Sequence, residues 1–275
     1  MVDFFKRQER VRAYYYRSII RMYKDILNNV KLFEEPLQIV KAINELCSTY
    51  DFEKFISTFT ANLFIKIETE NAKDWREAVL KSNRPNDFYK FLMENTKGQI
   101  MGLLKAKSLE NATLIKTIPS LFAQKATEYA TEEYLKGNRA SVIRDKVLSM
   151  YSDITEVEAQ RIARTEVSKA SSQLIQVRSK AVGINWYVWR TSKDKRVRHS
   201  HDIMEGVLVN FNNPPSPEKL AGEKYDYGVY NAGEIFNCRC YPEPVVDFDD
   251  IVFPAKVYLN GRIVRMRKSE FLKIA

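Results

Sequence analysis

Hydrophobic residues recur at helical spacing through most of the first two thirds of the chain. Over residues 3–30 they follow one another at intervals of three, four and seven, which places them on one side of an α-helix. This apolar side comprises Phe4, Val11, Tyr15, Ile19, Met22 and Ile26. The polar side is expected to carry Lys6, Arg7, Arg10, Arg12, Arg17 and Arg21. The pattern predicts a helix whose basic face is either solvated or bound to nucleic acid or an acidic partner.

The region that follows is predicted to form several more helices up to about residue 150. Pro36 suits a first helical turn. Apolar residues at helical spacing are expected to form a core, namely Phe52, Phe55, Ile56, Phe59, Leu63 and Ile67. Helix breaks are predicted at 71–74, 85–87 and 136–138, with one helix from Pro119 to about Leu135 and a shorter one near 139–150.

The most regular helix is predicted at 153–182. Thr155 and Glu158 have the spacing of a capping box, in which each side chain accepts a hydrogen bond from a free N–H at the helix start. One apolar stripe then continues for about six turns through Ala159, Ile162, Ala163, Val167, Ala170, Leu174, Val177 and Ala181. Gly183 is a natural residue to follow the helix end.

After Gly183 the pattern changes from helical to β-prone. Residues 184–191 are aromatic and β-branched and predict a strand, and 207–210 predict a second, short one. The proline-rich segment 211–236 predicts a long loop. Asn260-Gly261 between apolar flanks predicts a hairpin over 257–264.

The expected fold class is therefore mostly α with a small α+β C-terminal domain. We expect a helical N-terminal region over 1–152 and an α+β domain over 153–275, led by the long helix 153–182. Short strands and the terminal hairpin complete that domain.

Charge and cysteine content narrow the function classes. The net charge of +9 favours a polyanion such as DNA, although ten acidic residues against three basic ones in 201–250 argue against a uniformly basic surface. Three cysteines are too few for a disulfide framework. The first residues lack the apolar core of a signal peptide, and no run of 18 apolar residues predicts a membrane span.

Several motifs follow one another in a fixed order from the long helix to residue 240. They comprise Arg164, Thr165 and Glu166 on the helix, then Gly183 and Trp186, then Asp194, Arg196, Arg198 and His201, then Gly206, and last Asn237, Cys238, Arg239 and Cys240. Each piece is weak alone. In this order and spacing, about residues 161–240 resemble the phage Mu F-like head morphogenesis family of tailed bacteriophages.

The resemblance implies a minor capsid protein of the virion and no catalytic role. Members of this family are expected to associate with the portal protein and other head proteins during assembly in the host cytoplasm. They are then expected in the head interior or at the portal vertex, in contact with double-stranded DNA without sequence preference, acting in DNA delivery or ejection. No membrane partner is implied for the assembly stage.

The chemistry of the motif residues leaves three interpretations open. In the first, Asp194, Arg196 and Arg198 form ion pairs with Glu166 and other carboxylates, which would hold the strand on the helix. The second is a zinc-stabilised binding module with Cys238, Cys240 and His201 as ligands and His199 or Asp194 as the fourth; otherwise no cofactor is expected. The third is a nuclease-like enzyme with His201 as general base and Arg196, Arg198 and Arg239 holding a phosphate.

Overall fold

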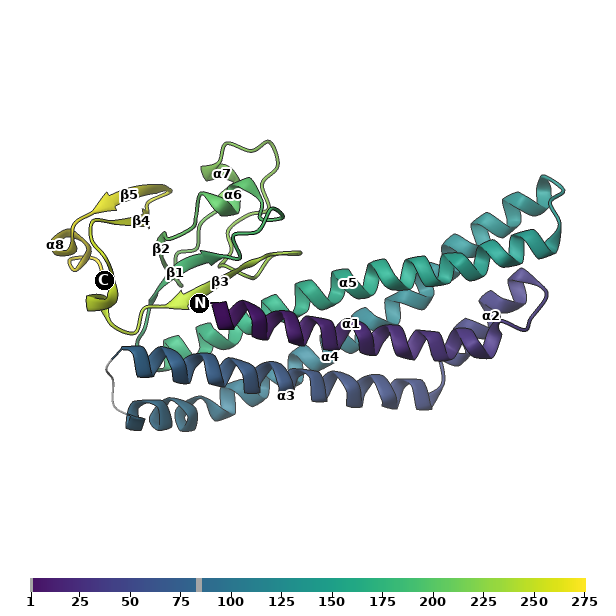
Figure 1. Ribbon diagram of the computed structural model, residues 1–275, viewed down its shortest axis with the longest axis horizontal. Helices are drawn as coiled ribbons and strands as arrows, with labels where there is room; N and C mark the ends of the chain where they lie inside the picture. Colours follow the sequence, from purple (N-terminus) through teal and green to yellow (C-terminus); the bar gives the residue numbers. More distant parts are fainter. Residues whose placement is uncertain (1, 83–85) are drawn as a thin grey trace. The chain divides into compact units, whose positions relative to one another are not determined.

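The computed structural model describes residues 2–82 and 86–275, and it divides the chain into two compact units. The first, here called the sheet unit, comprises Met1–Gln8, Lys66–Leu103 and Thr165–Ala275. The second, the bundle unit, comprises Glu9–Ile65 and Leu104–Arg164. The predicted fold class is confirmed, because long helices dominate the described residues and a small mixed sheet follows them (Figure 1).

Five long helices account for most of the chain up to residue 181. They are α1 (Val2–Val30), α2 (Pro36–Cys47), α3 (Tyr50–Lys81), α4 (Asn86–Leu135) and α5 (Ala140–Ala181). Pro36 occupies the first turn of α2 as predicted. Within the described residues, no helix is long and apolar enough to cross a membrane.

The core of the bundle unit is the apolar stripe that the sequence pattern predicts. Val11, Tyr15, Ile19 and Ile26 of α1 are all buried. The predicted core residues of α3 are buried as well, except Phe55, whose exposed fraction is 48%. The prediction for Phe55 is therefore wrong: the interval of three from Phe52 places it at the edge of the buried stripe.

The helices are longer than the sequence predicted, because two expected breaks lie inside them. Residues 71–74 are internal to α3, and Pro119 is internal to α4. A proline lacks the N–H that would bond to the carbonyl four residues earlier. Here that carbonyl, of Ile115, accepts a hydrogen bond from the Tyr23 hydroxyl at 2.8 Å. The expected break at 85–87 lies partly outside the described residues, and α4 begins there at Asn86.

The predicted capping box at Thr155 is wrong. Thr155 lies inside α5, which begins at Ala140 and therefore includes the separate helix expected near 139–150. Residues 140–154 contain neither glycine nor proline, so nothing in the backbone interrupts the helix there. The predicted ends are confirmed: Gly137 follows α4 and Gly183 follows α5, both with positive φ.

The sheet unit contains five strands in the order β3-β1-β2-β4-β5. Their bounds are β1 (Trp186–Thr191), β2 (Leu208–Asn210), β3 (Cys240–Pro244), β4 (Ala255–Leu259) and β5 (Arg262–Met266). Neighbours are antiparallel except β2 and β4, which are parallel. The predicted hairpin at Asn260-Gly261 is confirmed. Strand β3 was not predicted, because it contains Pro242 and Pro244 and prolines are rare inside strands.

Short helices complete the sheet unit: α6 (His199–Asp202), α7 (Pro217–Leu220), the 3-10 turn Phe248–Asp250 and α8 (Lys268–Phe271). Helices α6 and α7 lie side by side next to the strands (Figure 1).

Arg7 does not lie on an exposed basic face as expected. It is 8% exposed, and its guanidinium donates to Asp74 at 2.7 Å and to Glu77 at 2.8 Å. These carboxylates offset the cost of burying the cation. Burial raises the pKa of Asp74 to about 6, against the lowering effect of Arg7.

Candidate metal centre

Three motif residues that are far apart in sequence meet inside the sheet unit. His201 Nδ1 lies 3.5 Å from Cys238 Sγ and 3.4 Å from Cys240 Sγ. The three atoms all lie within 4.8 Å of one another. His201 is 2% exposed, Cys238 1% and Cys240 4%. The structure thus brings together the three residues that the zinc interpretation of the sequence named as metal ligands.

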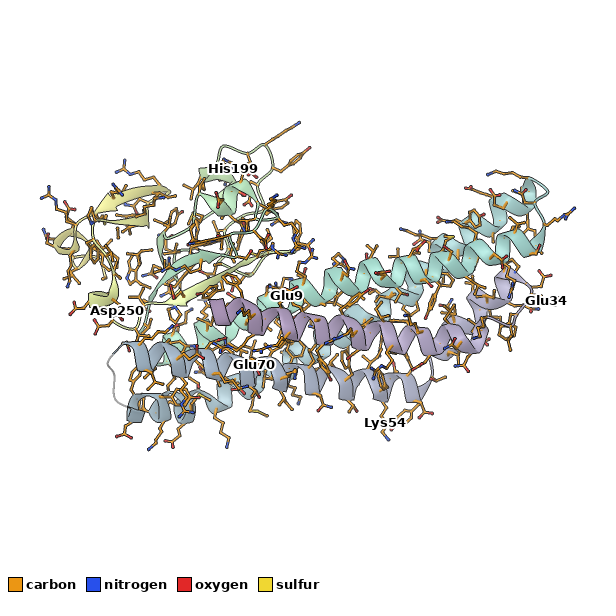
Figure 2. All side chains as sticks on the ribbon, in the orientation of Figure 1. Glu9, Glu34, Lys54, Glu70, His199 and Asp250 are labelled. Carbon is orange, nitrogen blue, oxygen red and sulfur yellow. The ribbon has the colours of Figure 1, made fainter. Side chains whose placement is uncertain are left out.

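Local backbone structure explains this convergence. The short helix α6 turns Ser200 and His201 inward, whereas His199, at its first position, is exposed (Figure 2). Cys240 begins β3, whose register pairs it with Thr191 at the end of β1. Asn237 has a positive φ of 53°, which bends the chain just before Cys238.

The other ring nitrogen of His201 faces two polar residues that sequence analysis did not identify. His201 Nε2 lies 3.0 Å from the Tyr230 hydroxyl, which donates to Glu218 Oε1 at 2.6 Å. Glu218 lies on α7 and is fully buried. Both residues come from the predicted loop 211–236, where no periodic pattern marks a residue as buried.

The two thiols differ in their acidity. Burial acts to raise the pKa of Cys238, but hydrogen bonds with Cys240 and His201 outweigh it and hold that pKa well below its ordinary value. Burial and the neighbouring Cys238 hold the pKa of Cys240 well above its ordinary value. The cluster therefore favours one thiolate beside an imidazole and disfavours two without a further positive charge.

Trp189 of β1 borders the same cluster. Its ring meets the His201 ring edge-on, with centroids 5.7 Å apart. The buried indole Nε1 has no close hydrogen-bond partner among the described residues. Its proximity to Cys240 acts to lower the pKa of that thiol, against the larger effect of burial.

Helix α5 holds the loop that carries the cysteines. The Thr165 hydroxyl accepts a hydrogen bond from the Asn237 N–H at 3.1 Å, and the Ser168 hydroxyl donates to the Cys238 carbonyl at 3.2 Å. Ser172 donates to the Ala232 carbonyl at 2.7 Å. Serines are unusual on the buried side of a helix, and this was the sequence signal that could have revealed the contact.

The charged motif residues form a second group. Arg239 Nε donates to Asp194 at 2.6 Å, and Asp194 also accepts from the Arg196 N–H at 2.9 Å. Partial burial acts to raise the pKa of Asp194, but these hydrogen bonds outweigh it and hold the pKa below its ordinary value. Arg198 donates to the Phe236 carbonyl at 3.0 Å and lies over the Phe236 ring, 4.6 Å from its centroid.

This group corrects the ion pairing expected from the sequence. Glu166 is buried, with the Lys169 amine 3.5 Å away. Arg196 has Asp194 as its carboxylate partner, and Arg198 has none among the described residues. Asp194 is held by Arg239, and His199 is exposed, so neither joins the three candidate ligands as the expected fourth.

The remaining motif residues shape the backbone or the core. Gly206 has a positive φ and donates its N–H to the Trp189 carbonyl at 2.9 Å. Trp186 is buried and packs edge-on against Phe271. Arg164 is half-buried on α5. The placement of Gly206 and Trp186 gives these two residues a structural role.

Chemically, the cluster of two thiols and one imidazole can hold a soft metal ion or pack as small buried groups. Its burial excludes a bulky substrate from His201. The Arg196 side chain is 66% accessible, whereas His201 is buried.

The comparisons with known proteins agree with the motifs. The model of the family described as "Phage Mu protein F like protein" matches residues 124–242. A protein of Haemophilus influenzae (strain ATCC 51907 / DSM 11121 / KW20 / Rd), described only as uncharacterized, is 28% identical over 170 residues, 62% of this chain and 34% of that protein. The chain thus spans about a third of the length of that relative. No solved structure matches the chain.

The matched region begins earlier than the motifs indicated. It includes the end of α4 and the whole of α5, and it closes just after Cys240. Residues 124–242 thus match the family described as Phage Mu protein F like protein, as the motifs predicted.

Proposed function

We propose that the chain is a minor head protein of a tailed bacteriophage that joins the head at the portal vertex and acts in DNA delivery. The observation that carries this proposal is the family match over residues 124–242. The motif residues inside it support the proposal, because most of them hold one small domain together.

A genetic experiment tests the role in the head. A stop codon early in this gene of the phage or prophage is expected to lower the infectious titre and remove the chain from purified virions. A plasmid copy should restore both. Virions that never contain the chain, together with an unchanged titre, would contradict the proposal.

Association with the portal is tested separately. The full chain is co-expressed with the portal protein of the same genome and the mixture is separated by size. Co-elution with the portal assembly is expected at low copy number. Elution of the chain only at its own size would contradict association with the portal. The role in the head would still be decided by the genetic experiment.

A basic stripe on α1 supports contact with DNA. Arg10, Arg17, Arg21 and Lys24 of the bundle unit are all exposed, at intervals of seven, four and three. These intervals place the four charges along one side of the helix. Such a stripe neutralises phosphates without reading bases, so binding is expected to be independent of sequence and sensitive to salt.

The DNA contact is tested by replacing these four residues with glutamine. The matched control replaces Lys54, Lys125, Arg139 and Lys146, four other exposed basic residues of the same unit. The stripe variant is expected to lower the slope of log affinity against log salt by about 3 to 4, and the control by less than half of that. Equal losses in both variants would assign the binding to net charge alone.

The nuclease alternative gains no support from the geometry. His201 is buried, and its ring nitrogens face two thiols and a tyrosine rather than a water-filled cleft. Arg196 and Arg198 are engaged with Asp194 and the Phe236 carbonyl. A general base must reach the proton that it removes.

A further inference from the structure

We propose that His201 Nδ1, Cys238 Sγ and Cys240 Sγ form a binding site for one soft divalent metal ion of the zinc class. The proposal goes beyond the role in the phage head and does not depend on it. It rests on the separations of the three atoms, on the balance of charge and on the groups behind the histidine.

The separations match those around a single tetrahedral ion. Zinc lies about 2.3 Å from a thiolate sulfur and about 2.0–2.1 Å from an imidazole nitrogen, which places the nitrogen and sulfur about 3.5 Å apart. The observed separations from His201 Nδ1 are 3.5 Å to Cys238 Sγ and 3.4 Å to Cys240 Sγ. Packing alone does not require two sulfurs to face the same ring nitrogen.

Charge gives the second argument. Two thiolates and a neutral imidazole carry a charge of −2, which a divalent cation neutralises. All three side chains are buried, and unpaired charges in such surroundings are costly. Zinc therefore converts an unfavourable pair of buried thiolates into a neutral unit, and thiolate and imidazole are the donors that it prefers.

The groups behind the histidine fix the ring for such an ion. With the metal on Nδ1, the ring proton of His201 resides on Nε2. The Nε2–H then donates a hydrogen bond to the Tyr230 hydroxyl 3.0 Å away. Tyr230 in turn donates to the buried carboxylate of Glu218 at 2.6 Å. A hydrogen-bonded carboxylate behind a ligating histidine is the usual way in which proteins orient that ligand.

The described residues supply three ligands, so a water molecule is expected to complete the tetrahedron. The site links α6 to β3 and to the end of the long loop. Metal binding would therefore hold in place a segment that has little regular structure of its own, as structural zinc does in small domains.

The test measures metal in the full-length chain, purified under reducing conditions without chelator and loaded with zinc alone. After dialysis, elemental analysis is expected to find about one zinc ion per chain. Cobalt(II) added in place of zinc should give tetrahedral d–d bands and a thiolate-to-cobalt charge-transfer band. Failure of the wild-type chain to retain zinc, or cobalt spectra without the charge-transfer band, would overturn the proposal.

Variants locate the ion. Cys238→Ser and Cys240→Ser are expected to lose it, whereas Cys47→Ser, which changes the half-buried cysteine of the bundle unit, should keep it. Retention of zinc by either of the first two at the wild-type ratio would overturn the assignment. Tyr230→Phe should still bind zinc but with about 10- to 100-fold lower affinity. Because it keeps both cysteines and the histidine, this variant tests the site without depending on the fold of a cysteine variant.

Discussion

The two units bury polar side chains of different kinds. In the bundle unit the buried polar groups are neutral, such as Thr60, Asn111 and Tyr23. In the sheet unit they include charged groups, since every buried arginine or glutamate of the described residues lies there: Arg7, Glu166, Arg178 and Glu218. The bundle unit could therefore be built from an apolar stripe with local hydrogen bonds, whereas the sheet unit depends on specific partners.

Substitutions should therefore lower the free energy of unfolding most in the sheet unit. A neutral hydrogen bond contributes about 1 kcal/mol, but removing the partner of a buried charge costs about 3 to 5 kcal/mol. Removing one polar partner should thus lower the free energy of unfolding more in the sheet unit than in the bundle unit. In the sheet unit the loss should also depend more on which of two partners is removed.

The largest effect is expected at the buried guanidinium of Arg178. It is fully buried, and it donates to Asn71 and, at 2.5 Å, to Glu68. Burial lowers the pKa of Arg178 and Glu68 acts to raise it, so the carboxylate stabilises the charged form. Glu68→Ala should lower the free energy of unfolding by about 3 kcal/mol, at the low end because Glu68 is partly exposed.

The matched control is Glu70→Ala on the same helix (Figure 2). Glu70 pairs with Lys73 at 2.7 Å, but Lys73 is 56% exposed, so this change should cost less than about 1 kcal/mol. Urea unfolding followed by circular dichroism measures both. Equal losses in the two variants would remove the distinction between buried charge and surface charge in this unit.

An intermediate effect is expected where the loop meets α5. Gly233 has a φ of 91°, and a Cβ there would lie 3.1 Å from the Ser172 Cβ and 3.2 Å from the Cys240 carbonyl oxygen. Gly233→Ala should cost about 2 to 3 kcal/mol, from backbone strain and from overpacking. The measurement is the thermal unfolding midpoint of the full chain.

Gly228→Ala separates the two causes. Gly228 has a similar φ of 86°, but a Cβ there would meet nothing within 4 Å. It should therefore show the strain alone, about 1 to 2 kcal/mol. If Gly233→Ala were no worse than this control, the loop would not be held as closely to Ser172 as the structure places it.

The sequence predicted the bundle unit better than the sheet unit, for a physical reason. The apolar stripe of a helix consists of residues only three or four positions apart, so Ile19 and Leu63 could be assigned to the core from local spacing. The ends of helices were harder, because Pro119 is tolerated only when a distant group satisfies the free carbonyl. Arg7 was misplaced for the same reason: its carboxylate partners lie about 70 residues away.

The candidate site was predicted in part. The order of the motifs identified His201, Cys238 and Cys240, and the structure brings these three together. Tyr230, Glu218 and Trp189 were not identified, because loops carry no period from which burial can be inferred. The prediction of Asp194 as a fourth ligand is wrong. Arg239, in the middle of the cysteine motif, donates a hydrogen bond to the Asp194 carboxylate.

The smallest effect is expected in the bundle unit, at the hydroxyl that replaces the hydrogen bond missing at Pro119. Tyr23 and Tyr151 are both 1% exposed, and their rings meet edge-on with centroids 6.0 Å apart. The Tyr23 hydroxyl donates to the Ile115 carbonyl at 2.8 Å, whereas the Tyr151 hydroxyl has no hydrogen-bond partner among the described residues. Tyr23→Phe leaves a buried carbonyl unsatisfied and should cost about 1 to 2 kcal/mol. Tyr151→Phe removes the same atom from the same kind of surroundings and should cost about 0.5 kcal/mol or less.

In a Pro119→Ala background the restored N–H at position 119 bonds to the Ile115 carbonyl, so the cost of Tyr23→Phe should fall toward that of Tyr151→Phe. A cost that stays the same in both backgrounds would mean that the hydroxyl contributes by packing, and the account of how α4 passes through a proline would fail.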